Sequence, residues 1–249
     1  MKEWIAGRNP VFEVLRARRR QVYRLLVADG VQSDARLDEI ARLAAARKVK
    51  AERVQRRALD PLAENHQGVA IEVSEYPYAA LEDILERAKQ RGEPPFVLLL
   101  DLIQNPQNLG TLLRSADAAG VHGAVIPPAR AAGVTPAVVH ASVGACEHLP
   151  VAQVNLHQAI TRLQEEGLWV VGLEGGADAQ PWDRVRLDGA LAIVVGNEGE
   201  GMRPLVRKSC DALLSLPMRG QIESLNAAVA GSIVLYRALQ AREERARKA

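Results

Sequence analysis

Short apolar runs alternate with helical segments between residues 96 and 216, and this alternation is the strongest constraint on the fold. The apolar runs cover residues 96–100, 124–126, 169–173, 191–195 and 212–216, with helical periodicity at 109–119 and 156–166. Strands that are apolar on both faces and separated by helices are typical of a parallel sheet covered by helices on both sides. We therefore expect an α/β domain over residues 96–249, ending in a long helix over 225–247.

Charge is divided unevenly along the chain. Residues 1–68 hold 15 Lys and Arg against 9 Asp and Glu, whereas the remainder holds 17 against 21. A basic part joined to a neutral or acidic one suits a protein in which one part attracts a polyanion, although a solvated charged surface is the alternative. The likeliest phosphate contacts by this reasoning are Arg8, Arg18, Arg19, Arg20 and Arg24.

The N-terminal pattern predicts a small α/β unit. A helix follows Asn9-Pro10, strand-like runs lie at 22–28, 49–54 and 69–73, and a second helix follows Ser33. Residues 75–95 contain Pro and Gly clusters around a charged amphipathic stretch. We predict a substrate-binding domain over 1–74, a linker over 75–95 and a second domain over 96–249.

The composition argues against a protein held by disulfides or a metal ion, and against one that spans a membrane. Cys146 and Cys210 are the only cysteines, no Cys-x-x-Cys pair occurs and the five histidines have no ligand-like spacing, so we expect neither disulfides nor a metal site. No apolar run approaches the roughly 18 residues of a membrane span. These features fit a protein of the reducing cytoplasm that carries no export signal.

Three motifs follow predicted strands, where ligands of open α/β sheets bind. The first is DLIQNPQNLGTLLRSADAAG at 101–120. Asn108 can cap the following helix and Gly110 allows close backbone approach, so both have structural alternatives. Arg114 is predicted to lie in the first turns of that helix, where the helix dipole disfavours a cation. An anionic partner such as RNA phosphate would offset that cost.

The other two motifs are loops without a phosphate-binding signature. GNEGEGM at 196–202 lacks the G-x-G-x-x-G spacing of dinucleotide folds and the Lys-Ser/Thr of a P-loop. The alternative for this motif is purely structural, since clusters of glycine also form ordinary tight turns. LPMRGQIESLN at 216–226 leads into the final helix, which Ser224 or Asn226 can cap.

The order and spacing of these motifs over residues 96–240 resemble the TrmH-like branch of the SPOUT methyltransferases, which methylate RNA ribose 2′-hydroxyls and carry a C-terminal trefoil knot. The basic N-terminal unit, beginning GRNPVFEVLR, resembles the L30e-like substrate-binding domain of the RlmB-type bacterial branch, which methylates a guanosine of 23S ribosomal RNA. The resemblance implies a small L30e-like α/β domain followed by a knotted parallel-sheet SPOUT domain, and a homodimer formed through the latter.

The resemblance also implies a site and a cofactor, S-adenosylmethionine. Its catalytic residues would be Asn108, Arg114, Glu198 and Asn226. The cofactor would lie against Leu173, Glu174, Gly175, Gly196, Leu216, Met218, Ser224 and Leu225. Because S-adenosylmethionine carries no phosphate, backbone groups in an apolar slot must recognise its adenine, which explains the glycines without a phosphate-binding motif.

Arg114 can act in two ways, as a general base or as a group that orients the 2′-oxygen. A guanidinium has a pKa above about 12, so stabilising the developing negative charge is the less demanding role. Two alternatives in function stay open, a tRNA ribose methyltransferase and a non-catalytic RNA-binding or ribosome assembly factor. A nicotinamide-dependent enzyme is disfavoured because the dinucleotide fingerprint is missing.

Overall fold

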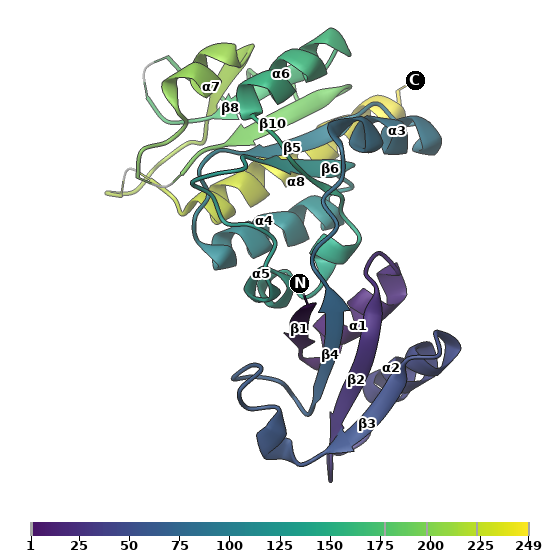
Figure 1. The fold of residues 1–249 in the computed structure, drawn as a ribbon. Coiled ribbons are helices and arrows are strands. Elements are labelled where there is room, and N and C mark those ends of the chain that lie inside the picture. Colours follow the sequence, from purple (N-terminus) through teal and green to yellow (C-terminus); the bar gives the residue numbers. More distant parts are fainter. Residues whose placement is uncertain (1, 177, 198, 223, 249) are drawn as a thin grey trace. The chain divides into compact units, whose positions relative to one another are not determined.

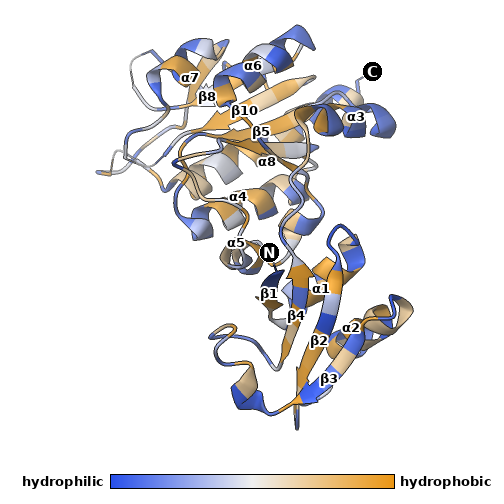
Figure 2. Cartoon of the chain, in the orientation of Figure 1, coloured by the Kyte–Doolittle hydropathy of each residue, from blue (hydrophilic) through white to orange (hydrophobic). Residues whose placement is uncertain are grey.

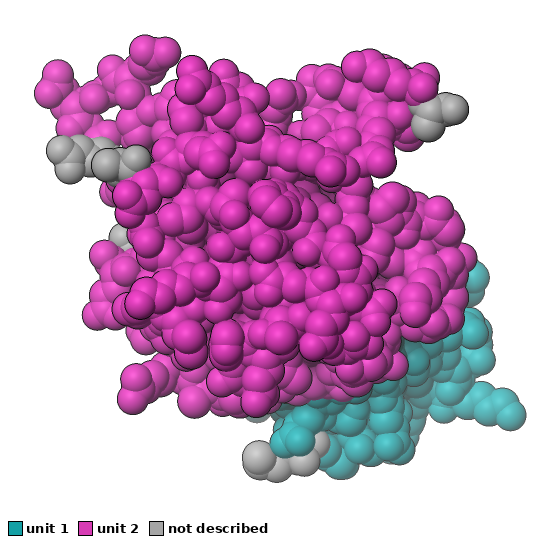
Figure 3. All heavy atoms as spheres, turned by 90° about the horizontal axis from the view of Figure 1, so that it is seen from above, with its two compact units in different colours: residues 1–77, 134–148 teal, residues 78–133, 149–249 magenta. Residues whose placement is uncertain are grey.

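The computed structural model describes residues 2–176, 178–197, 199–222 and 224–248. The chain forms two compact units, coloured separately in Figure 3. Unit 1 comprises Met1–Pro77 and Val134–His148, and unit 2 comprises Tyr78–Gly133 and Leu149–Ala249. The chain therefore passes between the units at three points in the sequence.

Unit 1 is built on a mixed sheet with the strand order β1-β4-β2-β3, in which β2 and β3 are parallel and the other pairs antiparallel (Figure 1). Its elements are β1 (Lys2–Ala6), α1 (Arg8–Ala17), β2 (Val22–Ala28), α2 (Ala35–Ala46), β3 (Lys50–Val54), η1 (Arg56–Ala58), β4 (Val69–Ser74), α5 (Pro136–Ala141) and η2 (Ala145–Glu147). The helices α1 and α2 pack against each other. The first strand, β1, has no counterpart in the sequence-based prediction.

Residues 134–148 are fastened to the rest of unit 1 by buried polar contacts. The fully buried Arg20 guanidinium donates to both carboxylate oxygens of the equally buried Glu147, at 2.9 and 3.1 Å, and to Glu3 Oε2 at 2.6 Å. Burial alone would lower the pKa of Arg20, but the charges of Glu147 and Glu3 outweigh it and raise that pKa. Tyr76 Oη adds a hydrogen bond of 2.9 Å to the carbonyl of Cys146.

Unit 2 contains, among the described residues, a seven-stranded parallel sheet with the order β7-β6-β5-β10-β8-β11-β9. The strands are β5 (Phe96–Leu100), β6 (Gly123–Ile126), β7 (Val151–Gln153), β8 (Trp169–Leu173), β9 (Gln180–Pro181), β10 (Leu191–Val195) and β11 (Ala212–Ser215). The helices are α3 (Leu81–Arg91), α4 (Pro106–Ala118), α6 (Leu156–Glu165), α7 (Pro204–Ser209) and α8 (Ala227–Ala246).

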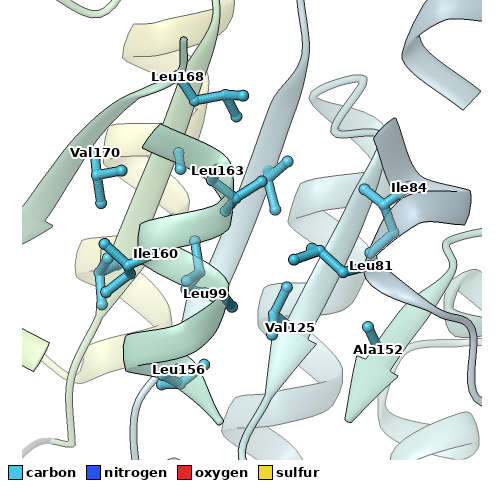
Figure 4. Close-up of a cluster of buried hydrophobic side chains, with 14 of the residues drawn as sticks. Leu81, Ile84, Leu99, Val125, Ala152, Leu156, Ile160, Leu163, Leu168 and Val170 are labelled. Carbon is cyan, nitrogen blue, oxygen red and sulfur yellow. The ribbon is translucent and has the colours of Figure 1, made fainter. Parts of the chain in front are cut away.

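Helices cover both faces of this sheet, and its central strands β5 and β10 are apolar along their length (Figure 2). On one face, Ile84 of α3 and Ile160 of α6 belong to a buried cluster with Leu99 and Val125 of the sheet (Figure 4). The helices α4 and α8 lie on the opposite face (Figure 1). A Cβ atom at Gly231 of α8 would lie 2.5 Å from Leu112 Cδ2 of α4, so a larger residue there would displace Leu112, and glycine allows the two helices to approach closely.

The predicted α/β fold with a parallel sheet and a small N-terminal unit is confirmed. The two units differ from the predicted division in two places. Residues 75–95, predicted as a linker, contain α3, whose apolar side covers β6 in unit 2. Residues 134–148, predicted as part of the second domain, belong to unit 1, where α5 packs against β1 and Glu147 pairs with Arg20. No helix in the described ranges is long and apolar enough to cross a membrane.

The buried pair of Arg20 and Glu147 gives a prediction about stability. We expect Glu147→Gln to lower the free energy of unfolding by about 3–5 kcal/mol, because it removes the fully buried one of the two carboxylates that pair with the Arg20 guanidinium. Urea unfolding followed by circular dichroism measures this. Glu166→Gln removes the half-exposed partner of Arg162 and should cost at most about 1 kcal/mol. Equal losses for the two variants would contradict the prediction.

Candidate functional site

The carboxyl ends of three parallel strands, β8, β10 and β11, surround a cavity in unit 2. The cavity has a volume of about 320 Å³. Its walls come from the segments that follow β8, β10 and β11 and from the start of α8. All eight residues predicted to bind the cofactor line it, namely Leu173, Glu174, Gly175, Gly196, Leu216, Met218, Ser224 and Leu225. The structure thus brings together residues that are up to 52 positions apart in sequence, from Leu173 to Leu225.

The wall after β10 is a hairpin that glycine makes possible. The backbone N–H of Asn197 donates to the carbonyl of Gly201 at 3.1 Å, and that of Gly201 donates back at 3.0 Å. A Cβ atom at Gly196 would lie 2.5 Å from the carbonyl carbon of Gly201 and 2.6 Å from the nitrogen of Met202. Because both are backbone atoms, the loop could not fold back in this way with a larger residue at position 196.

Asp101 anchors the far end of this hairpin to the end of β5. Its fully buried carboxylate accepts from the backbone N–H of Arg203 at 2.7 Å and from the Arg203 Nε at 2.8 Å. Asn197 Nδ2 also donates to the carbonyl of Leu102 at 3.3 Å. Leu102 has a φ of 59°, a strained value for a bulky residue. We did not predict roles for Asp101 and Arg203, although an acidic residue directly after an apolar strand was a usable signal.

Asn108 and Asn226, both predicted as catalytic, are in direct contact. Asn226 Nδ2 donates to Asn108 Oδ1 at 3.1 Å. Asn226 Oδ1 accepts from the backbone N–H groups of Ala228 and Val229, at 2.9 and 3.2 Å, and so caps α8. The predicted capping role of Asn108 is wrong, because α4 begins earlier and its cap is Asn105. The side-chain amide of Asn226 therefore caps α8 and also joins this helix to the first turn of α4.

Arg114 is exposed and lies in the second half of α4, four residues before its last residue, Ala118. The predicted dipole penalty is therefore wrong, because a cation near a helix C-terminus is favoured. Among the described residues its guanidinium makes no hydrogen bond or ion pair. Next to Arg114 in α4, Ser115 contacts α8, because Ser232 Oγ of α8 donates to Ser115 Oγ at 2.7 Å. Glu198, the remaining predicted catalytic residue, lies outside the described residues.

The arginines predicted to contact RNA differ in availability. The prediction for Arg20 is contradicted, because its guanidinium is buried against Glu147. Arg19 donates to Tyr76 Oη and the carbonyl of Pro77, both at 2.9 Å. Arg24 pairs with Glu72 at 2.9 Å, and Arg8 bonds to Asp34. Arg18, in a left-handed conformation after α1, is exposed.

Comparison with known proteins shows the family to which the chain belongs. Residues 95–236 match the model of the SpoU rRNA Methylase family, and residues 4–79 match a model described as RNA 2′-O ribose methyltransferase substrate binding. The chain is 41% identical over 238 residues to YacO of Bacillus subtilis, assigned to the TrmH family of tRNA/rRNA methyltransferases, and covers 94% of each protein. It is 43% identical over 236 residues to a tRNA/rRNA methyltransferase of Mycolicibacterium vanbaalenii, covering 94% of this chain and 74% of that one.

Solved structures agree with these matches. The SpoU methyltransferase AviRb from Streptomyces viridochromogenes, in complex with AdoMet, superposes with a TM-score of 0.81 at 26% identity, covering 98% of this chain and 91% of AviRb. An RNA 2′-O ribose methyltransferase superposes with a TM-score of 0.76 at 25% identity, covering 96% and 88%. The fold and the family models define an RNA methyltransferase. The chain belongs to the SpoU rRNA methylase family.

The contact between Asp101 and Arg203 gives a second prediction. We expect Asp101→Asn to lower the free energy of unfolding by about 1.5–3 kcal/mol, because charge-assisted hydrogen bonds to a buried group are lost. Thermal and urea unfolding measure the change. The control is Asp178→Asn, which removes an exposed partner of Arg207 in the same unit and should cost at most about 1 kcal/mol. A loss no larger than that of the control would show that the anchor contributes little.

Proposed function

We propose that this protein transfers a methyl group from S-adenosylmethionine to the ribose 2′-hydroxyl of a guanosine in 23S ribosomal RNA, as in the RlmB-type branch. The observation that carries the proposal is the single cavity lined by all eight predicted cofactor residues. The family and the AdoMet-bound AviRb structure support the cofactor, and the description of the match over residues 4–79 supports a ribose hydroxyl as the acceptor.

The chemistry of the cavity fits the cofactor. S-adenosylmethionine supplies an electrophilic methyl group and carries no phosphate. Among the described residues, the lining of the cavity contains no Lys or Arg, and it offers backbone at Gly175 and Gly196 beside the apolar side chains of Leu173 and Leu216. Met218 and Leu225 are about two fifths exposed and can close over an apolar ligand. Such a lining recognises adenine through backbone groups.

Arg114 is the group that acts on the ribose in this proposal. A guanidinium does not give up its proton near neutral pH, so Arg114 donates hydrogen bonds to the 2′-oxygen and stabilises the negative charge that develops there. Asn108 and Asn226 hold the first turn of α4 against α8 and so fix the position of the helix that carries Arg114. Glu198 is proposed as a further residue of the site.

The assembly and the topology are also proposals. Val229, Ile233 and Tyr236 are exposed on one side of α8, at fractions of 48%, 37% and 51%. Their spacing of four and three residues makes an apolar stripe that a second copy of the chain would cover. We propose a homodimer through this helix in the cytoplasm, and a trefoil knot in the segments after β10, as the family resemblance implies.

A tRNA substrate is the second candidate, because the relatives named above are tRNA/rRNA methyltransferases. The test is to incubate the protein with labelled S-adenosylmethionine and unmodified ribosomal or transfer RNA, then map ribose methylation by its block to alkaline cleavage. Label at a guanosine of 23S RNA is expected. Label confined to transfer RNA would overturn the proposed substrate, and no label in either RNA would overturn the proposed activity.

The role of Arg114 predicts a selective loss of turnover. We expect Arg114→Ala to reduce the single-turnover rate of methyl transfer by about 10²–10³-fold, the usual effect of removing a donor to a developing oxyanion. Cofactor affinity, measured by calorimetry, should change less than threefold because Arg114 does not line the cavity. Equal losses of rate and affinity would point to misfolding or to a purely binding role.

The hairpin after β10 predicts a matched pair of glycine variants. Gly196→Ala places a methyl group against backbone atoms, so we expect the affinity for S-adenosylmethionine to fall at least tenfold. Gly220 lies in the loop between β11 and α8, and a Cβ there meets nothing within 4 Å. Gly220→Ala should therefore bind the cofactor like the wild type. Unchanged binding by Gly196→Ala would remove the hairpin from the proposed cofactor site.

A further inference from the structure

Unit 1 contains a polar cavity whose lining includes only one of the predicted RNA contacts, Arg8. Its volume of about 550 Å³ lies within the range of roughly 300–1,000 Å³ that is usual for ligand sites. Three arginines, Arg8, Arg36 and Arg56, line it together with the amide side chains of Asn9 and Gln67, against one carboxylate, Asp34. The lining comes from the starts of α1 and α2 and from the loops after β2 and β3.

Arg8 builds the wall of this cavity. Its backbone N–H donates to Gln67 Oε1 at 2.9 Å, and its guanidinium donates to the carbonyl of Gln32 at 3.0 Å and to Asp34. Hydrogen bonds from the Leu37 N–H and from Arg8 hold the pKa of Asp34 below its usual value. Asp34 is therefore ionised and offset by Arg8. Because Arg36 pairs with Glu39, the charge of Arg56 is left to attract an anion.

Arg36 is held flat at the rim of the cavity. Its guanidinium carbon lies 4.0 Å from the centroid of the Phe12 ring, and its Nη1 donates to Glu39 Oε2 at 3.1 Å. The side chain is nevertheless 37% exposed. A guanidinium that lies over an aromatic ring and is still partly exposed offers a planar surface, and unpaired RNA bases stack on such arginine planes.

Arg56 and Asn9 supply the other groups that a nucleotide needs. Both are exposed, and within the described ranges neither side chain makes a hydrogen bond or ion pair. A guanidinium binds a phosphate through paired donors. An amide offers one acceptor and two donors, the combination that reads the edge of a base.

We propose that this cavity holds one unpaired nucleotide of the substrate RNA, with its base stacked on Arg36 and bonded to Asn9 and its phosphate on Arg56. The inference rests on the proposed function, because it assumes an RNA substrate. An unpaired nucleotide fits better than a duplex, since a base within a helix is stacked and cannot enter a cavity. The cavity would therefore select RNA that has an open loop or bulge.

The test compares variants of the full-length protein with unmodified ribosomal RNA as the substrate. Arg36→Lys keeps the charge but loses the planar surface, and Arg56→Gln loses the phosphate contact. We expect each to raise the KM for RNA about tenfold, with kcat and the affinity for S-adenosylmethionine unchanged. Arg56→Gln should also reduce the salt dependence of RNA binding by about one unit.

The matched control is Arg42→Gln, which removes an exposed arginine of α2 that does not line the cavity. It should leave the KM within about twofold of the wild type. Two results would overturn the inference: an unchanged KM for either cavity variant, or an equal effect of the control. A wild-type protein that methylates neither ribosomal nor transfer RNA would instead overturn the proposed function.

Discussion

The parallel pairing of β10 with β5 and β8 determines where the loops that follow these three strands lie in unit 2. Val195, the last residue of β10, is level with Leu100 of β5 on one side and with Leu173 of β8 on the other. Three strands therefore end at the same height, and Asp101, Glu174 and Gly196 leave the sheet side by side. A shift of one residue in any of these strands would exchange its two buried faces, so the helices on both sides enforce the register.

Contacts between the loops convert this shared edge into a cavity of fixed shape. Asp101 holds the hairpin after β10 to the end of β5, and Asn226 ties the start of α8 to the first turn of α4. Gly231 lets α8 approach α4 and β10 closely. A cofactor without phosphate cannot be held by a phosphate-binding motif, so the shape of the cavity and the positions of its backbone groups must recognise the adenine.

Much of unit 2 could be predicted from the sequence because its strands are buried on both faces. The bounds of β5, β8 and β10 agree with the apolar runs at 96–100, 169–173 and 191–195. The cofactor residues came from the family resemblance, and the structure places them at one cavity, whereas apolar periodicity alone could not have joined segments so far apart. The errors lie where tertiary contacts outweigh local pattern. Asn105 caps α4 in place of Asn108, and a distant arginine draws residues 134–148 into unit 1.

The arginines of unit 1 show why net charge is a weak guide to individual RNA contacts. A positive excess over residues 1–68 attracts a polyanion wherever the charges lie, since the field at a distance depends on their sum. Contact with a phosphate requires a guanidinium with free donors, and Arg20 and Arg24 direct theirs to Glu147 and Glu72. Such paired arginines stabilise the fold and contribute little to the field, because each is offset by its carboxylate. In the proposed nucleotide site, Arg56 has such free donors, because its side chain makes no hydrogen bond or ion pair among the described residues.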